Sequence, residues 1–242
     1  MHAIEIKALT KRYRDTVAVD GLTLAIDEGE LFALLGVNGA GKTTTIKMLS
    51  CLTRPDSGDA TVLGDSITEH PSAVKRKIGV SPQETAVAAG LSVQENLALI
   101  CGIYGFSREK TASRIAELSK MLSLQDVMHK KAGKLSGGYA RRLSIAMALI
   151  SEPQVLFLDE PTLGLDVLAR SELWDLIRSL KGRVTVILTT HYMEEAEELS
   201  DRIAIMKDGR LLMCDTPAGI KEKTGTDSIE RAFIQIVKEG RA

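Results

Sequence analysis

The chain has 242 residues, 44% of them hydrophobic and 26% charged, which suits one large α/β domain with a well-buried core. A net charge of -1 gives no electrostatic reason to expect nucleic acid as a partner. Cys51, Cys101 and Cys214 lie far apart without metal-ligand spacing, which fits a reducing compartment. No signal peptide is predicted, and no apolar run approaches the roughly 20 residues that a membrane helix needs.

The first elements along the chain are predicted strands. Residues 4–9 and 22–26 alternate between apolar and polar side chains, as strands with one buried face do. Residues 31–35 form a continuous apolar run that ends at Gly36, the pattern of a buried parallel strand. A helix is predicted over residues 43–50, and a turn over residues 55–58.

The segment between this strand and this helix matches the phosphate-loop pattern G-x-x-x-x-G-K-[ST]. Its glycines allow backbone N–H groups to face phosphate oxygens, and the helix N-terminus adds a favourable partial charge. Lys42 is expected to neutralise phosphate charge, and the Thr43 hydroxyl to bind Mg²⁺. A glycine-rich turn with a lone lysine is the alternative, which the flanking strand and helix disfavour. The predicted nucleotide-binding residues here are Gly36, Val37, Asn38, Gly39, Ala40, Gly41, Lys42, Thr43 and Thr44.

The middle third of the chain is predicted to be helical. Between about residues 93 and 149, apolar residues recur at helical spacing and strand patterns nearly vanish. Gln83, after a short strand at 78–80, can both donate and accept, and so can join Mg²⁺ or water to a mobile segment. Ser136, Gly137 and Gly138 open the last of these helices. Ser136 suits an N-cap, but the same free N–H groups can also bind an anion from outside.

Three more buried strands follow, at residues 155–158, 184–188 and 203–206, with a helix at 169–180 between the first two. Strands and helices in this alternation predict βαβ crossovers and a mainly parallel sheet. A turn at Asp208-Gly209 leads to a strand at 210–214, and a short helix is predicted at 229–238.

Two carboxylates and a histidine lie at the carboxyl ends of these strands, the edge where such sheets bind ligands. Asp159 can reach Mg²⁺. Glu160 is expected to point elsewhere because strand side chains alternate, and it can polarise an attacking water as a general base. His191 can donate to a terminal phosphate. Alone, the acidic pair would suit a helix N-cap and the histidine a structural role, but the phosphate loop favours a phosphoryl-transfer site.

Together the motifs resemble, in their order, those of the nucleotide-binding domain of ABC transporters, over residues 4–213. Tyr13 resembles the aromatic residue that stacks on adenine in this family, although a surface tyrosine beside a strand is the simpler alternative. The other matching segments are Gln83 for the Q-loop, residues 135–138 for the signature, 158–162 for Walker B, 164–166 for the D-loop, and His191 for the switch histidine.

The resemblance implies a subunit that binds ATP with Mg²⁺ held by Thr43, Gln83 and Asp159. It also implies that two copies dimerise head to tail, so that Ser136, Gly137 and Gly138 of one copy contact the γ-phosphate bound by the other. Asp166 would then link the two sites. Two positions depart from the family pattern: Tyr139 stands where glutamine is usual, and Val167 where proline is common.

Residues 41–46, 189–196 and 228–233 are similar to the ATPases of two-component ABC-2 exporters, which include drug-efflux and sodium-extrusion systems. This implies export of an ion or small molecule through a separate membrane permease, with the chain on the cytoplasmic face of the membrane. The alternatives are a soluble ABC-type ATPase that acts on nucleic acid or ribosomes, and a P-loop kinase. Neutral charge and the single nucleotide site disfavour the first, and the signature helix disfavours the second.

The predicted fold is an α/β P-loop NTPase with a mainly parallel sheet, an antiparallel β part and an inserted helical subdomain. Residues 1–242 are predicted to form a single ATPase domain. Its helical subdomain spans about 84–152, and a helical tail spans 215–242.

Overall fold

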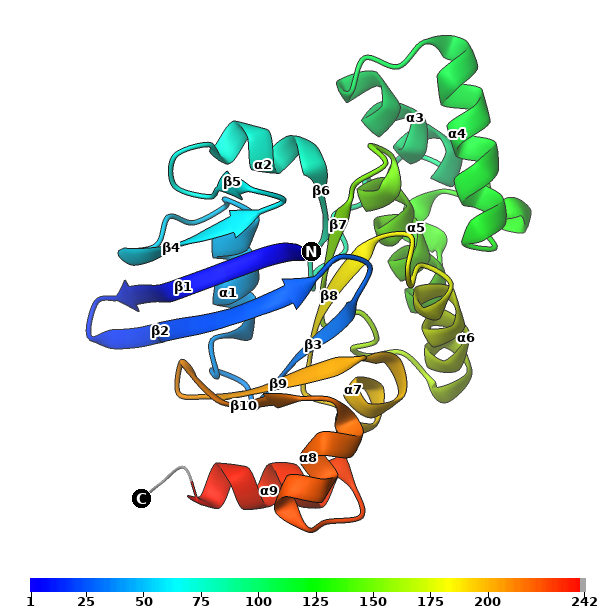
Figure 1. Ribbon diagram of the computed structural model, residues 1–242. Helices are drawn as coiled ribbons and strands as arrows, with labels where there is room; N and C mark the ends of the chain where they lie inside the picture. The colour runs from blue at the N-terminus through cyan, green and yellow to red at the C-terminus, as the bar shows by residue number, and fades with distance from the viewer. Residues whose placement is uncertain (240–242) are drawn as a thin grey trace.

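The computed structural model describes residues 1–239 and contains two sheets (Figure 1). The predicted helical tail therefore ends outside the described residues at positions 240–242. The larger sheet has six strands in the order β10-β9-β3-β8-β7-β6. Its strands are β3 (Leu31–Leu35), β6 (Ile78–Ser81), β7 (Val155–Asp159), β8 (Thr185–Thr190), β9 (Arg202–Lys207) and β10 (Arg210–Asp215). All neighbouring pairs are parallel except β9 with β10, so the predicted mainly parallel α/β sheet is confirmed.

The smaller sheet has four antiparallel strands in the order β2-β1-β4-β5. They are β1 (His2–Tyr13), β2 (Thr16–Asp27), β4 (Ser57–Val62) and β5 (Asp65–Ser66). The turn predicted at 55–58 is wrong in its second half, because β4 begins at Ser57. Gly58 has φ +75°, and an added Cβ would lie 2.2 Å from the Ala8 carbonyl oxygen. Only glycine therefore suits this position, where the register of β4 against β1 shifts.

The helical middle third is confirmed, and it stands beside the sheets at the upper right of Figure 1. Ser92 and Glu95 form a capping box at the start of its first helix. The helices there are α3 (Val93–Ile103), α4 (Arg108–Met121) and α5 (Gly137–Leu149), with short 3-10 turns η1 (Gln125–Val127) and η2 (Ala132–Lys134). The remaining helices are α1 (Lys42–Leu49), α2 (Pro71–Lys77), α6 (Val167–Arg178), α7 (Met193–Leu199), α8 (Pro217–Thr224) and α9 (Ile229–Glu239).

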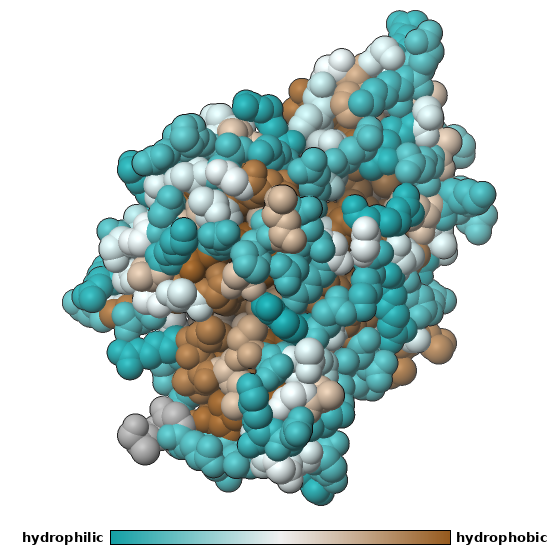
Figure 2. Space-filling view, in the orientation of Figure 1, coloured by the Kyte–Doolittle hydropathy of each residue, from teal (hydrophilic) through white to brown (hydrophobic). Residues whose placement is uncertain are grey.

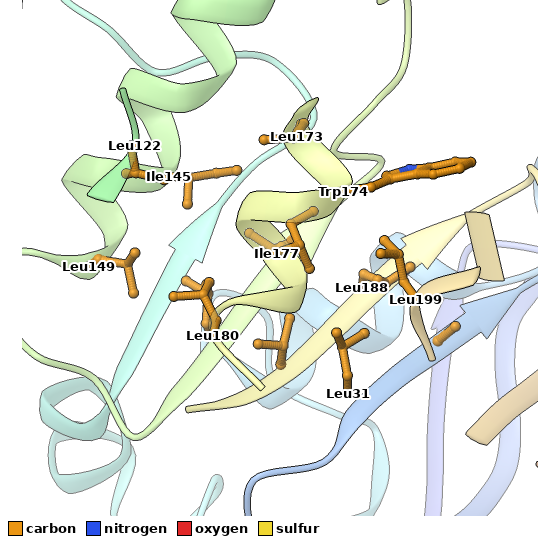
Figure 3. Close-up of a cluster of buried hydrophobic side chains, with 14 of the residues drawn as sticks. Leu31, Leu122, Ile145, Leu149, Leu173, Trp174, Ile177, Leu180, Leu188 and Leu199 are labelled. Carbon is orange, nitrogen blue, oxygen red and sulfur yellow. The ribbon is translucent and has the colours of Figure 1, made fainter. Parts of the chain in front are cut away.

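The hydrophobic core lies on both faces of the six-stranded sheet. Alternate residues of β3 divide between two buried clusters, with Leu31 in one and Phe32 in the other. On one face, Leu173, Trp174 and Ile177 of α6 belong to the cluster shown in Figure 3, and Trp174 projects to the side away from α5. α5 also packs against β6, where Ser144 Oγ lies 2.9 Å from Ser81 Oγ.

The surface in the view of Figure 2 is mostly hydrophilic, with hydrophobic residues gathered over β2, β9 and β10 and toward α9. Among residues 1–239, no helix is both long enough and apolar enough to cross a membrane.

Candidate nucleotide-binding site

The predicted site residues gather because β8 lies between β3 and β7 in the sheet. Leu35 at the end of β3 pairs with Thr190, and Asp159 at the end of β7 pairs with Thr189. The phosphate loop, the carboxylates and His191 therefore leave three adjacent strands at one edge.

The phosphate loop connects β3 to α1 with a backbone that only glycine suits at Gly41. This residue has φ +99°, and an added Cβ would lie 2.4 Å from the Ala18 carbonyl oxygen. Lys42 is buried, and its Nζ donates to the carbonyl oxygens of Gly36 at 2.7 Å and Val37 at 3.3 Å. The ammonium group is thus held at the mouth of the loop, where phosphate charge would need it.

Thr43 and Asp159 meet across the sheet edge. The Thr43 hydroxyl donates to Asp159 Oδ1 at 3.0 Å, although 116 positions separate the two residues. Thr189 Oγ1, at the end of β8, donates to the same carboxylate oxygen at 2.5 Å. A hydroxyl and a carboxylate are the hard oxygen ligands that Mg²⁺ prefers, so this pair fits the metal that the sequence predicts.

Glu160 connects the carboxylate pair to the histidine. Its Oε2 lies 2.8 Å from His191 Nδ1, and its Oε1 lies 3.5 Å from Lys42 Nζ. The strand alternation expected at Glu160 is wrong, because this residue lies beyond the end of β7. The strand ends at Asp159, and Glu160 has a left-handed backbone with φ +48°, supported by two bonds from its N–H to Thr189.

A cavity of about 530 Å³ opens at this place. It includes most of the predicted nucleotide-binding residues together with Glu160 and His191, and also Thr16, Ala18 and Leu163, for which the sequence carries no local signal. The lining residues are Thr16, Ala18, Asn38, Gly39, Ala40, Gly41, Lys42, Thr43, Thr44, Gln83, Glu160, Leu163 and His191.

Tyr13 does not line the cavity. It ends β1 with 46% of its surface exposed, and it pairs in register with Thr16, which does line the cavity. Tyr13 therefore lies beside the rim, where Lys11 Nζ is 5.5 Å from its ring centroid.

The signature and D-loop residues also lie outside the cavity. Ser136 caps α5 by accepting from the Tyr139 N–H at 3.5 Å, and Asp166 caps α6 by accepting from the Ala169 N–H at 2.9 Å. Both capping residues are exposed. The two helix starts pack together, because a Cβ on Gly138 would lie 3.2 Å from the Ala169 Cβ. The signature residues and Asp166 thus lie on a surface apart from the chain's own phosphate loop.

Tyr139, the unusual residue of the signature, has a structural partner. The Arg142 guanidinium carbon lies 5.3 Å from its ring centroid, and the ring packs against the core cluster.

Comparison with known proteins decides the family. A sequence model described as ABC transporter matches residues 19–163, and a second, an AAA domain, matches residues 132–195. The chain is 43% identical over 230 residues to the daunorubicin resistance ATP-binding protein DrrA2 of Streptomyces coeruleorubidus, covering 95% of this chain and 71% of that protein. The chain belongs to the ABC transporter family.

Further relatives agree. The Nod factor export ATP-binding protein I of Burkholderia orbicola (strain AU 1054) is 41% identical over 94% of this chain and 75% of its own length. Among solved structures, the ATP-binding subunit of an ABC transporter superposes with a TM-score of 0.86 at 28% identity, covering 97% of this chain and 99% of the other. A dimeric ATP-binding cassette bound to ADP and Pi in a post-hydrolysis state gives 0.80 at 28% identity, covering 88% and 98%. This ABC transporter family member is an ATP hydrolase with the predicted P-loop fold.

Proposed function

We propose that the chain is the ATP-hydrolysing subunit of an exporter, and that it powers the passage of an ion or small molecule through a separate membrane permease. The meeting of Thr43 with Asp159, beside Lys42 and the Glu160–His191 pair, carries this proposal. The relatives named for drug resistance and for Nod factor export support the direction of transport.

In this proposal the site residues bind the nucleotide, hold the metal and activate the attacking water. The N–H groups of residues 36–44 bind the phosphates of ATP, and Lys42 neutralises their charge. Thr43 and Asp159, with Gln83, hold Mg²⁺, which when bound offsets the charge that develops on the phosphate oxygens. Glu160 accepts the proton of the attacking water, and His191 orients Glu160 and donates to the γ-phosphate. Tyr13, beside the rim, stacks on the adenine.

We further propose a head-to-tail dimer of this chain. Because the exposed Ser136 and Gly137 lie outside the chain's own cavity, they are available to the γ-phosphate held by a second copy. Exposed Asp166 then connects the two sites. The dimeric cassettes among the solved relatives support this arrangement.

The permease is assigned to a groove between the sheet edge and the helical subdomain. This groove, about 480 Å³, is lined by Leu52, Val80, Pro82, Ile103 and Tyr104, and Ile103 is 71% exposed. Such an exposed apolar groove suits a short helix of the permease at the cytoplasmic face of the membrane. In this proposal residues 1–242 form one ATPase domain, with the helical subdomain at about 84–152 and the tail at 215–242.

Co-purification tests the proposal. A tagged chain expressed with the proteins of its own cell is expected to be recovered from detergent-solubilised membranes together with a multi-spanning protein, and ATP hydrolysis should accompany the complex. Lys42→Ala is the control that should keep the complex and lose hydrolysis. Recovery only with ribosomes or nucleic acid would instead support the soluble ATPase alternative.

A further inference from the structure

Arg141 is a buried cation on the signature helix α5, with only 4% of its surface exposed. Its neighbour Arg142 pairs with Glu172, but the hydrogen bonds of the Arg141 guanidinium go to backbone carbonyls. Burial lowers the pKa of Arg141, and the negative charges of Asp159 and Glu195 oppose this effect. Burying a cation is costly unless its donors are satisfied, so the groups that satisfy them are significant.

Those groups are two consecutive carbonyls of the Gln83 segment. Nη1 donates to the Pro82 oxygen and Nη2 to the Gln83 oxygen, both at 2.6 Å. The planar guanidinium fork can hold two neighbouring acceptors at once, and charge-assisted bonds of this kind are about twice as strong as neutral ones. The side chain of Gln83 meanwhile lines the nucleotide cavity.

We propose that Arg141 is a positioning residue that ties the backbone of Gln83 to the signature helix, so that the Gln83 side chain and Ser136 keep a fixed relation to each other. This inference rests on the proposed roles of Gln83 and Ser136 in the ATPase cycle. In this arrangement, a shift of Gln83 toward bound nucleotide is passed to the start of α5, four to five residues from Arg141 along the same helix.

Arg114 provides a matched control for the contribution that an arginine–carbonyl contact makes to holding α5 in place. Arg114 on α4 donates to the carbonyls of Leu149 and Ile150 at the opposite end of α5. It makes the same kind of contact with the same helix, but far in sequence from Gln83. A general contribution to holding α5 in place should therefore be lost in both variants.

The test is a double-mutant cycle on ATP turnover. Arg141→Met is expected to lower kcat by about tenfold while the Kd for ATP changes less than about threefold, because the phosphate loop is intact. In a Gln83→Ala background the same substitution should change kcat by less than about twofold, since its effect passes through Gln83. Arg114→Met should leave kcat within about twofold of the wild type.

A second measurement does not depend on activity. In hydrogen exchange without nucleotide, Arg141→Met should speed exchange of the backbone amides around residues 83–88, and Arg114→Met should not. If Arg141→Met does not fold, Arg141→Lys, which keeps the charge but cannot bond both carbonyls equally, replaces it in both measurements.

The possible outcomes distinguish the positioning role of Arg141 from the proposed function of the chain. An equal loss of kcat in the wild-type and Gln83→Ala backgrounds, or unchanged exchange around Gln83, overturns the positioning role. A wild-type chain that hydrolyses no ATP alone or with its permease would instead overturn the proposed function, and the exchange measurement would still report on Arg141.

Discussion

Glu160 is the residue whose surroundings bear most directly on turnover. We expect Glu160→Gln to lower kcat by two to four orders of magnitude, roughly the usual loss when a general base is removed. ATP binding should persist, because Lys42 and the loop amides are unchanged. Steady-state hydrolysis and equilibrium binding of a fluorescent ATP analogue measure the two quantities. Glu194→Gln, an exposed position on α7, is the control, and wild-type turnover in Glu160→Gln would exclude the general-base role.

Glu195 is a second carboxyl whose environment sets its behaviour. It has no exposed surface, and its Oε1 accepts from Thr162 Oγ1 at 2.8 Å and Trp174 Nε1 at 3.2 Å. Burial raises the pKa of this carboxyl above its ordinary value, and the charge of Glu160 adds to the increase, while hydrogen bonds from its neighbours oppose it. The protonated form is therefore favoured in the folded protein relative to the unfolded chain.

The sign of the resulting pH dependence follows from linkage. Because the folded state binds more protons at Glu195, its contribution to stability falls as pH rises from the ordinary carboxyl range through the raised pKa. Glu195→Gln, which is neutral at every pH, should remove this decline. Urea unfolding of both proteins at about pH 5 and about pH 8 measures it. A wild-type-minus-Gln difference that does not change with pH would contradict the raised pKa.

Glu195→Ala should behave differently because it leaves two buried donors without an acceptor. We expect a loss of about 2–6 kcal/mol in the free energy of unfolding, at about 1–3 kcal/mol for each of the two unsatisfied groups. Trp174 is the only tryptophan of the chain and bonds to Glu195, so its emission spectrum should shift in Glu195→Ala and stay close to the wild type in Glu195→Gln.

The sequence identifies those site residues that lie next to one another along the chain. The phosphate loop is recognisable because one loop must present several N–H groups and a lysine in order. The contacts of Thr189, Glu195 and Arg141 were missed because their partners lie 30, 33 and 58 or 59 positions away. Unlike Thr43 and Asp159, these pairs are not joined by a ligand that the sequence predicts.

At the scale of elements, α5 carries the signature at its exposed start. We expect Ser136→Arg to leave ATP binding by the single chain unchanged and to block dimer formation, because a long cation would occupy the place of the second copy's phosphate. Light scattering with and without ATP measures this. Ser107→Arg is the control, since Ser107 caps α4 with the same chemistry by accepting from the Lys110 N–H. Normal ATP-induced dimerisation of Ser136→Arg would argue against the proposed contact.

Elements with strong periodicity were predicted well, and elements shaped by pairing were not. The spacing of Val93, Leu97 and Ile100 identified α3 because a helix buries one stripe whatever its neighbours are. In contrast, β4 and the full length of β1 depend on irregular pairing around Ala8 and Gly58. In the sequence, the residues at this irregularity look like a turn. β5 and α2 were not predicted, because each is too short to show a repeating pattern of apolar residues.

At the scale of the whole molecule, the separation of cavity and signature predicts the assembly. Glu160→Gln with ATP should elute at twice the 26.2 kDa mass of the chain and contain one ATP per chain, because hydrolysis no longer separates the copies. Nucleotide quantification after size-exclusion chromatography measures this. Lys42→Ala in the same background should remain a monomer, and a Glu160→Gln protein that stays monomeric at saturating ATP would contradict the head-to-tail model.

β8 lies between β3 and β7, and this arrangement sets the distance between the phosphate loop and the carboxylates. Two interstrand spacings, about 10 Å in total, separate the strand that carries the lysine loop from the strand that carries the carboxylates. Peptide hydrogen bonds, rather than any side chain, determine that width. The groove proposed to receive the permease can therefore change its residues without altering the dimensions of the chemical centre, whereas a slip in strand register would alter them.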